Sequence, residues 1–260
     1  MYKCPICNQI LNKEINTYKC INKHSFDIGK NNYLNLNTNM RKDTGDSDLL
    51  VNARNEFLNT NNYKPLLDKL VAIINKYNPN TIIDLACGTG YYTNSLSNNA
   101  KIYGFDLAKK AIIKACRSRK DNTNYLVSSI FDLPLFDHTI DLALLIFAPL
   151  PLDEIKRVLK INGIFIEVIP NINHLVEIKE IIYPKVILNN PKVIDDQSLV
   201  LIDSYNLDYK MLLSAEELLN LYMMTPYYYK SPKGAINKLN EAAPINISAN
   251  FIINVYKLIR

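Results

Sequence analysis

A short β-branched apolar run stops at a carboxylate at residues 81–85 and leads directly into a loop of small residues. The run reads Thr-Ile-Ile-Asp-Leu, and the loop reads Ala-Cys-Gly-Thr-Gly before two tyrosines. A strand followed by such a loop and a helix start is the arrangement that holds a nucleotide-like cofactor across the end of a parallel strand. Gly88 and Gly90 carry no Cβ, so the backbone there can approach a ligand closely. This segment therefore predicts an α/β fold with a cofactor site at the carboxyl end of the strand.

The spacing within the loop separates the cofactor classes. A dinucleotide loop reads G-x-G-x-x-G, but this chain has Tyr91 at the third glycine position and Ala86 at the first. The chain contains no G-x-x-x-x-G-K-[ST] segment, which excludes a P-loop. The next apolar run, at 101–105, ends at Asp106, whose carboxylate can accept hydrogen bonds from both hydroxyls of a ribose. Asp84, Gly88, Gly90 and Asp106 are the candidate cofactor residues from this pattern. The alternative is a tight βα turn in which Asp106 only caps a helix.

Strand-like and helix-like patterns alternate after residue 81. Strands are expected at 82–86, 102–105, 125–127, 141–147, 163–169, 205–213 and 251–258. Helices are expected at 49–58, 65–76, 92–96, 109–118, 152–159, 175–183 and 215–223. A β-α-β-α order of this kind predicts a doubly wound parallel sheet with helices on both faces.

The N-terminal residues contain a metal-ligand pattern. Cys4, Cys7, Cys20 and His24 are spaced C-x2-C-x12-C-x3-H, which suits a tetrahedral zinc ion. Four protein ligands leave no open position, so the site is expected to be structural. Zinc would supply the folding free energy that so small a unit lacks. The alternative is four unrelated residues.

Composition bounds the function classes. A chain of 260 residues can bury a sizeable core and accommodate one large domain and a small one. The predicted boundaries are a zinc module at 1–36, a linker and helices at 37–76, and the catalytic domain at 77–260. The net charge of +5 is compatible with an anionic partner such as RNA. No apolar run reaches the length of a membrane span, the start has no signal-peptide pattern, and the five cysteines suit a reducing compartment, so we expect a cytoplasmic protein.

The loop and Asp106 together resemble the S-adenosylmethionine site of class I methyltransferases. With the zinc pattern, nearly the whole chain resembles the large-subunit (23S) ribosomal RNA (guanine-N1)-methyltransferases. The matching segments, besides the zinc ligands and the loop, are 25–27, 45–47, 53–54, 57–58, 63–66, 133–134, 147–149, 170, 174–175 and 224–226. The resemblance implies a Rossmann-like, doubly wound, mostly parallel seven-stranded sheet behind a small zinc-binding module.

The family also implies functional residues. Zinc ligands are implied at Cys4, Cys7, Cys20 and His24, and cofactor contacts at Tyr63, Gly88, Thr89 and His174. From the residues alone, Tyr63 would be a packed aromatic and His174 a surface residue. The chain departs from the family at Ala86, which replaces a glycine, and at Thr89, where the family often has Glu. Residues 45–47 favour the family branch that modifies the earlier of two guanines in one hairpin.

The implied reaction is methyl transfer from S-adenosylmethionine to N1 of a guanine in 23S ribosomal RNA. No proton acceptor is assigned, although Asp132 and Asp137 lie in the loop after the third strand. Phe147 offers an aromatic plane on which a base could stack. The zinc module and the segment around Arg41 and Lys42 are candidates for gripping the hairpin, and a homodimer would help to enclose it. The alternatives are a small-molecule methyltransferase of the same fold and a non-catalytic zinc-containing RNA-binding protein.

Overall fold

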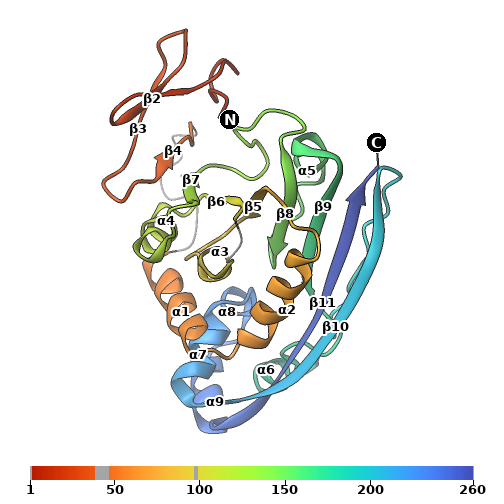
Figure 1. Cartoon of the computed structure of the whole chain (residues 1–260). Helices are drawn as coiled ribbons and strands as arrows, with labels where there is room; N and C mark the ends of the chain where they lie inside the picture. The colour runs from red at the N-terminus through yellow and green to blue at the C-terminus, as the bar shows by residue number, and fades with distance from the viewer. Residues whose placement is uncertain (1, 39–46, 97–98, 260) are drawn as a thin grey trace.

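A central sheet of eight strands dominates the part of the chain that the structure, a computed structural model, describes, namely residues 2–38, 47–96 and 99–259. The spatial order is β10-β11-β9-β8-β5-β6-β7-β4 (Figure 1). The strands are β4 (Leu34–Asn35), β5 (Thr81–Leu85), β6 (Lys101–Asp106), β7 (Thr123–Val127), β8 (Ile140–Ile146), β9 (Leu159–Pro170), β10 (Leu199–Leu213) and β11 (Ile245–Leu258). Neighbours from β4 to β9 pair in parallel, whereas β11 is antiparallel to both β9 and β10.

The strand order places a topological switch beside β5. From β5 the chain first builds outward through β6 and β7, and it then returns to β8 on the other side of β5. In open α/β sheets, ligands bind outside the carboxyl ends of the strands at such a switch. The predicted parallel sheet is confirmed, and the carboxyl end of β5 is the expected place for the site.

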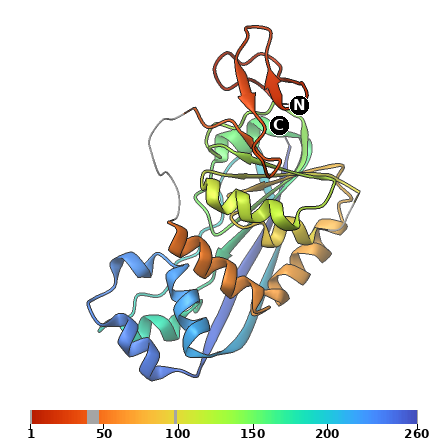
Figure 2. The same ribbon diagram turned by 90° about the vertical axis from the view of Figure 1, so that its left-hand side faces the viewer.

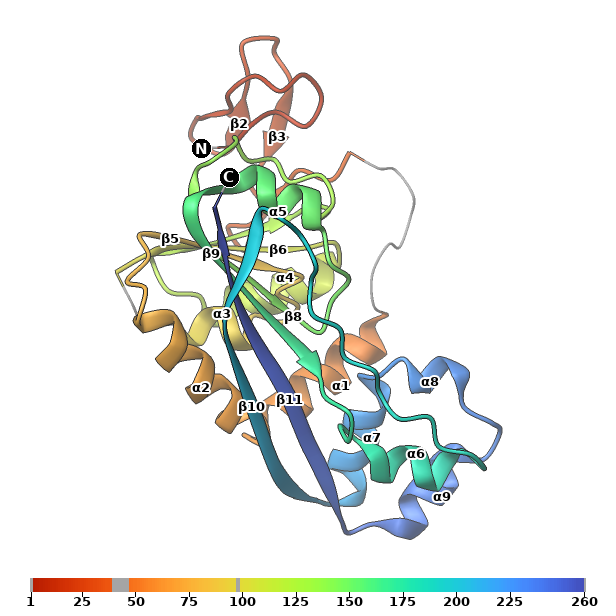
Figure 3. The same ribbon diagram turned by 90° about the vertical axis from the view of Figure 1, so that its right-hand side faces the viewer.

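Both faces of the parallel part of the sheet are buried, as expected for strands joined by crossover helices, whereas the edge strand β10 is largely exposed. Ile82 of β5 points to one face, which is covered by α1 (Asp48–Asn59), α2 (Lys64–Asn75), α6 (Val176–Ile182), α7 (Ala215–Met223) and α9 (Ala235–Ala242). Ile83 points to the opposite face, where α5 (Leu152–Val158) packs with residues of the zinc module. Figure 2 shows α1 and α2 across one side of the sheet, and Figure 3 shows α5 near the module.

The remaining helices are short. They are α3 (Tyr91–Ser95), α4 (Lys109–Ala115), which continues as a 3-10 turn at Cys116–Ser118, and α8 (Tyr227–Lys230). The expected helices are found with end shifts of a few residues, and α8 and α9 were not predicted. No helix in the described ranges is both long and apolar enough to cross a lipid bilayer.

The N-terminal module is a three-stranded antiparallel sheet of β1 (Asn12–Lys13), β2 (Thr17–Lys19) and β3 (Ser25–Asp27). The next strand, β4, leaves this small sheet and pairs with β7 of the large one, which adds an eighth strand to the seven expected. The module therefore continues into the central sheet through β4. The module boundary at residue 36 stays a prediction, and Arg41, Lys42, Gly45 and Asp46 lie outside the described residues.

Candidate functional site

A cavity of about 450 Å³ lies at the carboxyl ends of β5, β6 and β8. This size suits a small-molecule or cofactor site. The lining includes the loop after β5, the acid at the end of β6, and five aromatic residues, namely Tyr63, Tyr91, Tyr92, Phe131 and Phe147. The sequence-predicted residues that line it are Tyr63, Asp84, Gly88, Thr89 and Asp106. The structure thus brings together residues that are 43 positions apart, and their role in cofactor binding stays a prediction.

Asp106 ties the cofactor loop to the second strand. The backbone N–H of Gly88 donates to Oδ2 at 2.8 Å, and the N–H of Ala108 donates to Oδ1 at 2.7 Å. Each carboxylate oxygen can accept more than one hydrogen bond. Asp106 therefore holds the turn after β6 and also lines the cavity. The two roles that the sequence offered as alternatives, a helix cap and a ligand contact, are compatible in this geometry.

The loop backbone turns through three left-handed residues. Ala86, Gly88 and Gly90 have φ values of 59°, 54° and 79°. A Cβ at Gly90 would lie 2.5 Å from the Tyr125 hydroxyl, so both sterics and conformation require glycine there. Gly90 begins α3 and is not among the residues that line the cavity. Ala86 adopts the positive φ that alanine tolerates poorly, in the position where the family has glycine.

Asp84 is a buried acid beneath this loop, and it is only 2% exposed. The Thr93 hydroxyl donates to its Oδ2 at 2.5 Å. Burial raises the pKa of Asp84 to about 7, the Thr93 bond opposes this rise, and the negative charge of Asp106 adds to it. The Asp84 carboxyl group is therefore an acid that titrates near neutral pH.

His174 does not line the cavity. It is buried, and its ring stacks on Phe147 with a centroid distance of 6.1 Å and an interplanar angle of 13°. Its Nδ1 accepts a hydrogen bond from the N–H of Asn250 at 3.3 Å. Burial, helped by the charge of Lys179, lowers the pKa of His174 to about 3, so the ring is neutral at pH 7. The expectation of a surface histidine from the residues alone was wrong, because the end of β9 folds it under the aromatic cluster.

Phe147 is one of the aromatic residues that form the cavity wall. It follows β8, it is 42% exposed, and its φ is 53°. A bulky residue in the left-handed region is strained, and such residues gather at functional sites. Tyr63 and Phe251 pack near it at 6.4 and 5.4 Å between ring centroids. These rings and His174 hold Phe147 in place while part of its surface stays open.

Two hydroxyl groups near the cavity lack a protein partner. Among the described residues, the hydroxyls of Tyr91 and Tyr92 are buried and make no hydrogen bond, and both tyrosines line the cavity. A buried unsatisfied hydroxyl costs about 1–3 kcal/mol, so such a pair calls for an explanation. Both hydroxyl oxygens are shielded from the open cavity as well as from solvent, so they are a local cost of packing these rings against the core and not a contact for a ligand.

Arg54 and Phe131 are cavity residues to which the sequence assigned no role. Arg54 comes from α1 and is the one Lys or Arg among the described residues that line the cavity. Its Cδ lies 3.8 Å from the position that a Cβ on Gly88 would occupy. Helical periodicity placed Arg54 on a helix but could not show that this helix crosses the loop. Asp132 and Asp137 do not line the cavity, and Asp137 instead forms an ion pair with Arg157 at 2.7 Å.

The zinc pattern forms a compact cluster. The ligand atoms of Cys4, Cys7, Cys20 and His24 all lie within 4.8 Å of one another. His24 Nδ1 is 3.5 Å from the sulfur atoms of Cys4 and Cys20, and the sulfur atoms of Cys7 and Cys20 are 3.7 Å apart. Ligands at about 2.3 Å (sulfur) and 2.0 Å (nitrogen) from one ion stand about 3.5–3.8 Å apart in a tetrahedron. The observed spacings therefore fit a zinc ion bound by these four residues.

Each half of the cluster sits on a tight turn. The N–H of Asn8 donates to the carbonyl of Cys4 at 2.8 Å, and the N–H of Lys23 donates to the carbonyl of Cys20 at 2.9 Å. Asn8 and Lys23 have positive φ, as the last residues of such turns often do. The second turn ends directly before His24.

A switch-point cavity over a sheet with one reversed strand, preceded by a zinc cluster, defines a class I methyltransferase with a zinc ribbon. Comparison with family models agrees: a methyltransferase domain matches residues 78–238, and the N-terminal domain of RlmA, a zinc ribbon, matches residues 2–42. The chain belongs to the methyltransferase-domain family, and its zinc ribbon is of the RlmA type. The resemblance seen in the sequence is thereby confirmed.

Two curated relatives and one solved structure illustrate the similarity. The chain is 27% identical over 275 residues to "Putative 23S rRNA (guanine-N(1)-)-methyltransferase YxjB" of Bacillus subtilis (strain 168), covering 98% of this chain and 97% of that protein. It is 30% identical over 184 residues to the 23S rRNA (guanine(748)-N(1))-methyltransferase of Streptomyces fradiae, and the alignment covers 68% of this chain and 65% of that protein. The crystal structure of the YcgJ protein from Bacillus subtilis has a TM-score of 0.47 and 16% sequence identity to this chain, and the superposition covers 75% of this chain and 97% of YcgJ.

Proposed function

We propose that this methyltransferase transfers the methyl group of S-adenosylmethionine to N1 of a guanine in a hairpin of 23S ribosomal RNA. The observation that carries the proposal is the union, in one chain, of the cofactor cavity and a zinc ribbon of the RlmA type. Relatives that align over most of this chain bear the name of that activity. The zinc ribbon is the feature that a general small-molecule methyltransferase would not need.

The residues around the cavity fit the cofactor. When bound, S-adenosylmethionine supplies a methyl group activated by the positive charge of its sulfur. Asp106 would accept hydrogen bonds from the ribose hydroxyls, while Gly88 and Thr89 would lie along the ligand and Gly90 would turn the chain into α3. Tyr63 would contact the cofactor directly.

His174 would contribute to the same site through Phe147, on which it stacks. Asp84 would support the loop from below through its bond with Thr93.

The target base would stack on Phe147. The ring is exposed at the cavity, is held by neighbouring rings and follows β8 beside the switch point. Base stacking on an aromatic side chain is worth about 1–3 kcal/mol, and a splayed base of a hairpin presents a free face for it. Positioning of N1 against the methyl group would then provide most of the rate acceleration.

The zinc ribbon would grip the RNA hairpin. Lys13, Lys23 and Lys30 are exposed on it, whereas Lys19 forms an ion pair with Glu14 at 2.6 Å. The proposal includes a homodimer enclosing the hairpin and a cytoplasmic location. Sedimentation of the protein with and without RNA would test the first, and cell fractionation would test the second.

The test maps N1-methylguanine in ribosomal RNA. N1 methylation blocks Watson–Crick pairing, so reverse transcriptase stops at the modified base. We expect one stop in a 23S hairpin that is present with the wild-type protein and absent from a strain without it. An unchanged pattern would overturn the proposal. Methylation of free nucleosides without ribosomal RNA would support the small-molecule alternative, and failure to bind S-adenosylhomocysteine would support the non-catalytic one.

A variant of Asp106 tests the cofactor placement. Asp106→Ala should weaken S-adenosylhomocysteine binding by about 10- to 150-fold, because it removes charge-assisted bonds worth about 1.5–3 kcal/mol. Calorimetry measures the affinity, and metal analysis should still find one zinc per chain. Loss of zinc together with cofactor binding would show that Asp106 is needed for the fold as a whole.

A further inference from the structure

One wall of the cofactor cavity is a loop that the zinc ribbon holds at both ends. The cavity-wall loop, residues 128–135, follows β7 and contributes Ile130 and Phe131 to the cavity. The start of the loop is held by β4, because Leu34 and Asn35 of β4 pair with the last two residues of β7. The N–H of Leu36 also donates to the carbonyl of Val127 at 2.9 Å. The first described residues of the chain hold its far end.

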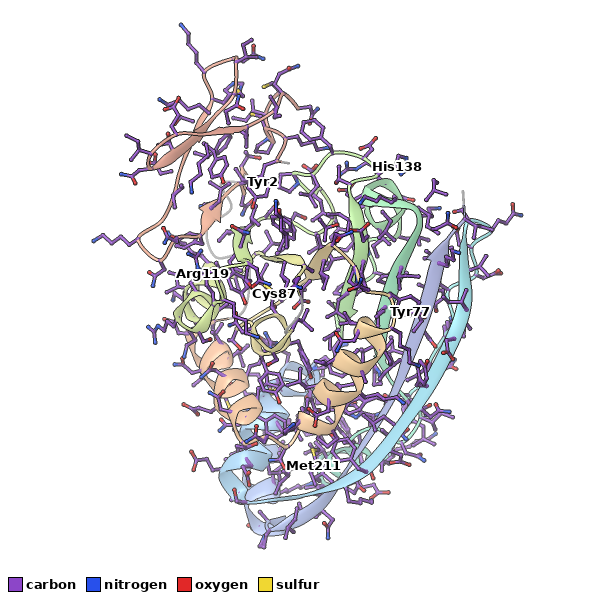
Figure 4. All side chains as sticks on the ribbon, viewed as in Figure 1. Tyr2, Tyr77, Cys87, Arg119, His138 and Met211 are labelled. Atoms are coloured by element: carbon purple, nitrogen blue, oxygen red, sulfur yellow. The ribbon has the colours of Figure 1, made fainter. Side chains whose placement is uncertain are left out.

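Tyr2 and Lys3 make that second attachment. Tyr2 forms an antiparallel bridge with Leu135, and the N–H of Lys3 donates to the carbonyl of Pro134 at 3.0 Å. The Tyr2 ring contacts Tyr103 of β6 edge-on at 5.9 Å and Tyr18 of β2 at 5.4 Å. Figure 4 shows Tyr2 where the ribbon meets the sheet, with Cys87 of the cofactor loop below it. Tyr2 thus joins the small sheet, the large sheet and the cavity-wall loop.

The apolar core is continuous from the zinc ligands to the cavity. Cys4 and Cys20 are buried in the same cluster as Tyr2, Leu135 and Ile130. Ile130 is 7% exposed, so it is packed into this cluster as well as lining the cavity. Close-packed interiors transmit displacements, so a change in how the ribbon packs should reach Ile130.

The far end of the loop is also held from the side of α5. Arg157 donates to the carbonyl oxygens of Leu133 and Leu135 at 2.9 and 2.7 Å, and the N–H of Leu133 donates to Glu154 at 2.6 Å. These bonds hold the loop near its far end, beside the attachment made by Tyr2 and Lys3, whereas the start of the loop is attached through β4. The ribbon itself depends on zinc, since it has too little core to fold alone.

We infer that Tyr2 is a positioning residue for the cofactor cavity, and that zinc binding and cofactor binding are coupled through it. The inference rests on the proposed function, because it takes the cavity as the S-adenosylmethionine site. Zinc orders the ribbon, the ribbon docks Tyr2 and Lys3 against the cavity-wall loop, and the loop holds Ile130 and Phe131 in place for the cofactor. The ribbon therefore supports the catalytic domain in addition to any contact with RNA.

The first measurement is the affinity for S-adenosylhomocysteine in full-length, zinc-loaded protein. Tyr2→Ala should weaken it about tenfold, within the usual range of coupling between sites. Tyr2→Phe keeps the ring contacts and should bind like the wild type. Ile15→Ala, at a residue of the ribbon that is 92% exposed, is the matched control and should also bind normally. All four proteins should contain one zinc ion per chain.

The second measurement uses the reciprocity of linkage, which a merely structural role of Tyr2 would not produce. In the wild type, zinc affinity is measured by competition with a chelator, with and without saturating S-adenosylhomocysteine. The cofactor product should raise the zinc affinity by the same factor by which zinc raises the affinity for S-adenosylhomocysteine. This effect should be absent in Tyr2→Ala. Two results would overturn the inference and leave the proposed function intact. The first is a Tyr2→Ala protein that binds S-adenosylhomocysteine as tightly as the wild type does. The second is a zinc affinity of the wild type that does not change when S-adenosylhomocysteine is added. Failure of the wild type to bind S-adenosylhomocysteine would overturn both.

Discussion

At the scale of single residues, the cofactor loop contains an alanine in a glycine conformation. Ala86 has a φ of 59°. It lies between the buried strand β5 and Gly88, whose backbone N–H is hydrogen-bonded to Asp106. The left-handed conformation costs an L-residue about 1–2 kcal/mol relative to its preferred ones. The loop keeps this shape because the surrounding contacts outweigh that cost.

Replacing Ala86 with glycine should therefore be harmless. Ala86→Gly relieves the left-handed strain while adding freedom to the unfolded chain, so we expect the free energy of unfolding to stay equal or rise by up to about 1 kcal/mol. The matched control is Ala143→Gly in the buried strand β8, which should lose about 1 kcal/mol. Urea unfolding of both variants provides the comparison. A loss at Ala86 as large as that at Ala143 would contradict the strain argument.

Asp84 gives the protein a predictable pH dependence. Burial raises its pKa to about 7 in the folded state, whereas the unfolded group titrates near its ordinary value of 3.8. Between these two values the folded state binds one proton more than the unfolded state, so the contribution of Asp84 to stability falls as the pH rises. Asp84→Asn removes this dependence and can still accept the bond from Thr93.

The measurement is urea unfolding of the wild type and Asp84→Asn at several pH values from 5.5 to 8. The stability of Asp84→Asn relative to the wild type should rise up to a pH near 7 and level off above it. Titrations elsewhere in the molecule cancel in this difference. A difference that does not change with pH would show that Asp84 has an ordinary pKa in the folded protein.

At the scale of elements, α7 combines a strong local signal with a role in the site. Ser214 and Glu217 form a reciprocal capping box, with the N–H of Ser214 donating to Glu217 at 2.9 Å. Asn62, which precedes Tyr63, also donates to Glu217 at 3.0 Å. The cap that begins α7 therefore also anchors the turn that presents Tyr63 to the cavity.

Ser214→Ala should lower the free energy of unfolding by about 1 kcal/mol, the usual cost of losing an N-cap. Ser95→Ala is the control, because that hydroxyl bonds the carbonyl of Tyr91 one turn back at 2.7 Å, an arrangement that adds little to helix stability. Thermal or urea unfolding measures both. Equal effects of the two substitutions would mean that the capping box carries no special weight in α7.

At the scale of the whole molecule, RNA affinity should depend on salt and cofactor affinity should not. Each phosphate neutralised by a lysine contributes about −0.7 to −0.9 to the slope of log K against log salt. Replacing Lys13 and Lys23 of the ribbon with Gln should therefore reduce the size of this slope by about 1.4 to 1.8 for a 23S hairpin. Lys238→Gln on α9, which Figure 1 shows at the end of the molecule opposite the ribbon, is the control.

Fluorescence anisotropy at several salt concentrations gives the slope for each protein. A slope that is the same in the double variant and the wild type would place the RNA elsewhere. S-adenosylhomocysteine affinity measured over the same salt range serves as the internal reference, because the proposed cofactor contacts do not involve phosphate groups.

The parts that sequence predicted well are those that depend on short-range pattern. The order of strands and helices followed from apolar periodicity, and the capped helix α7 was predicted at its observed bounds, Ala215–Met223. The short elements β4 and α8 were missed, because two- and four-residue segments hold too few side chains to show a period. β4 exists only because β7 lies beside it to supply hydrogen bonds.

The sequence by itself determined the zinc cluster, the shape of the cofactor loop and the class of the fold, because spacing and periodicity act between residues close along the chain. Only the tertiary structure decided that His174 stacks behind Phe147, that Arg54 reaches the loop, and that Tyr2 docks the zinc ribbon against the cavity-wall loop. These contacts join segments tens of residues apart. They form because burying shared apolar surface outweighs the entropy of closing the chain between them, and no local pattern records which surfaces will meet.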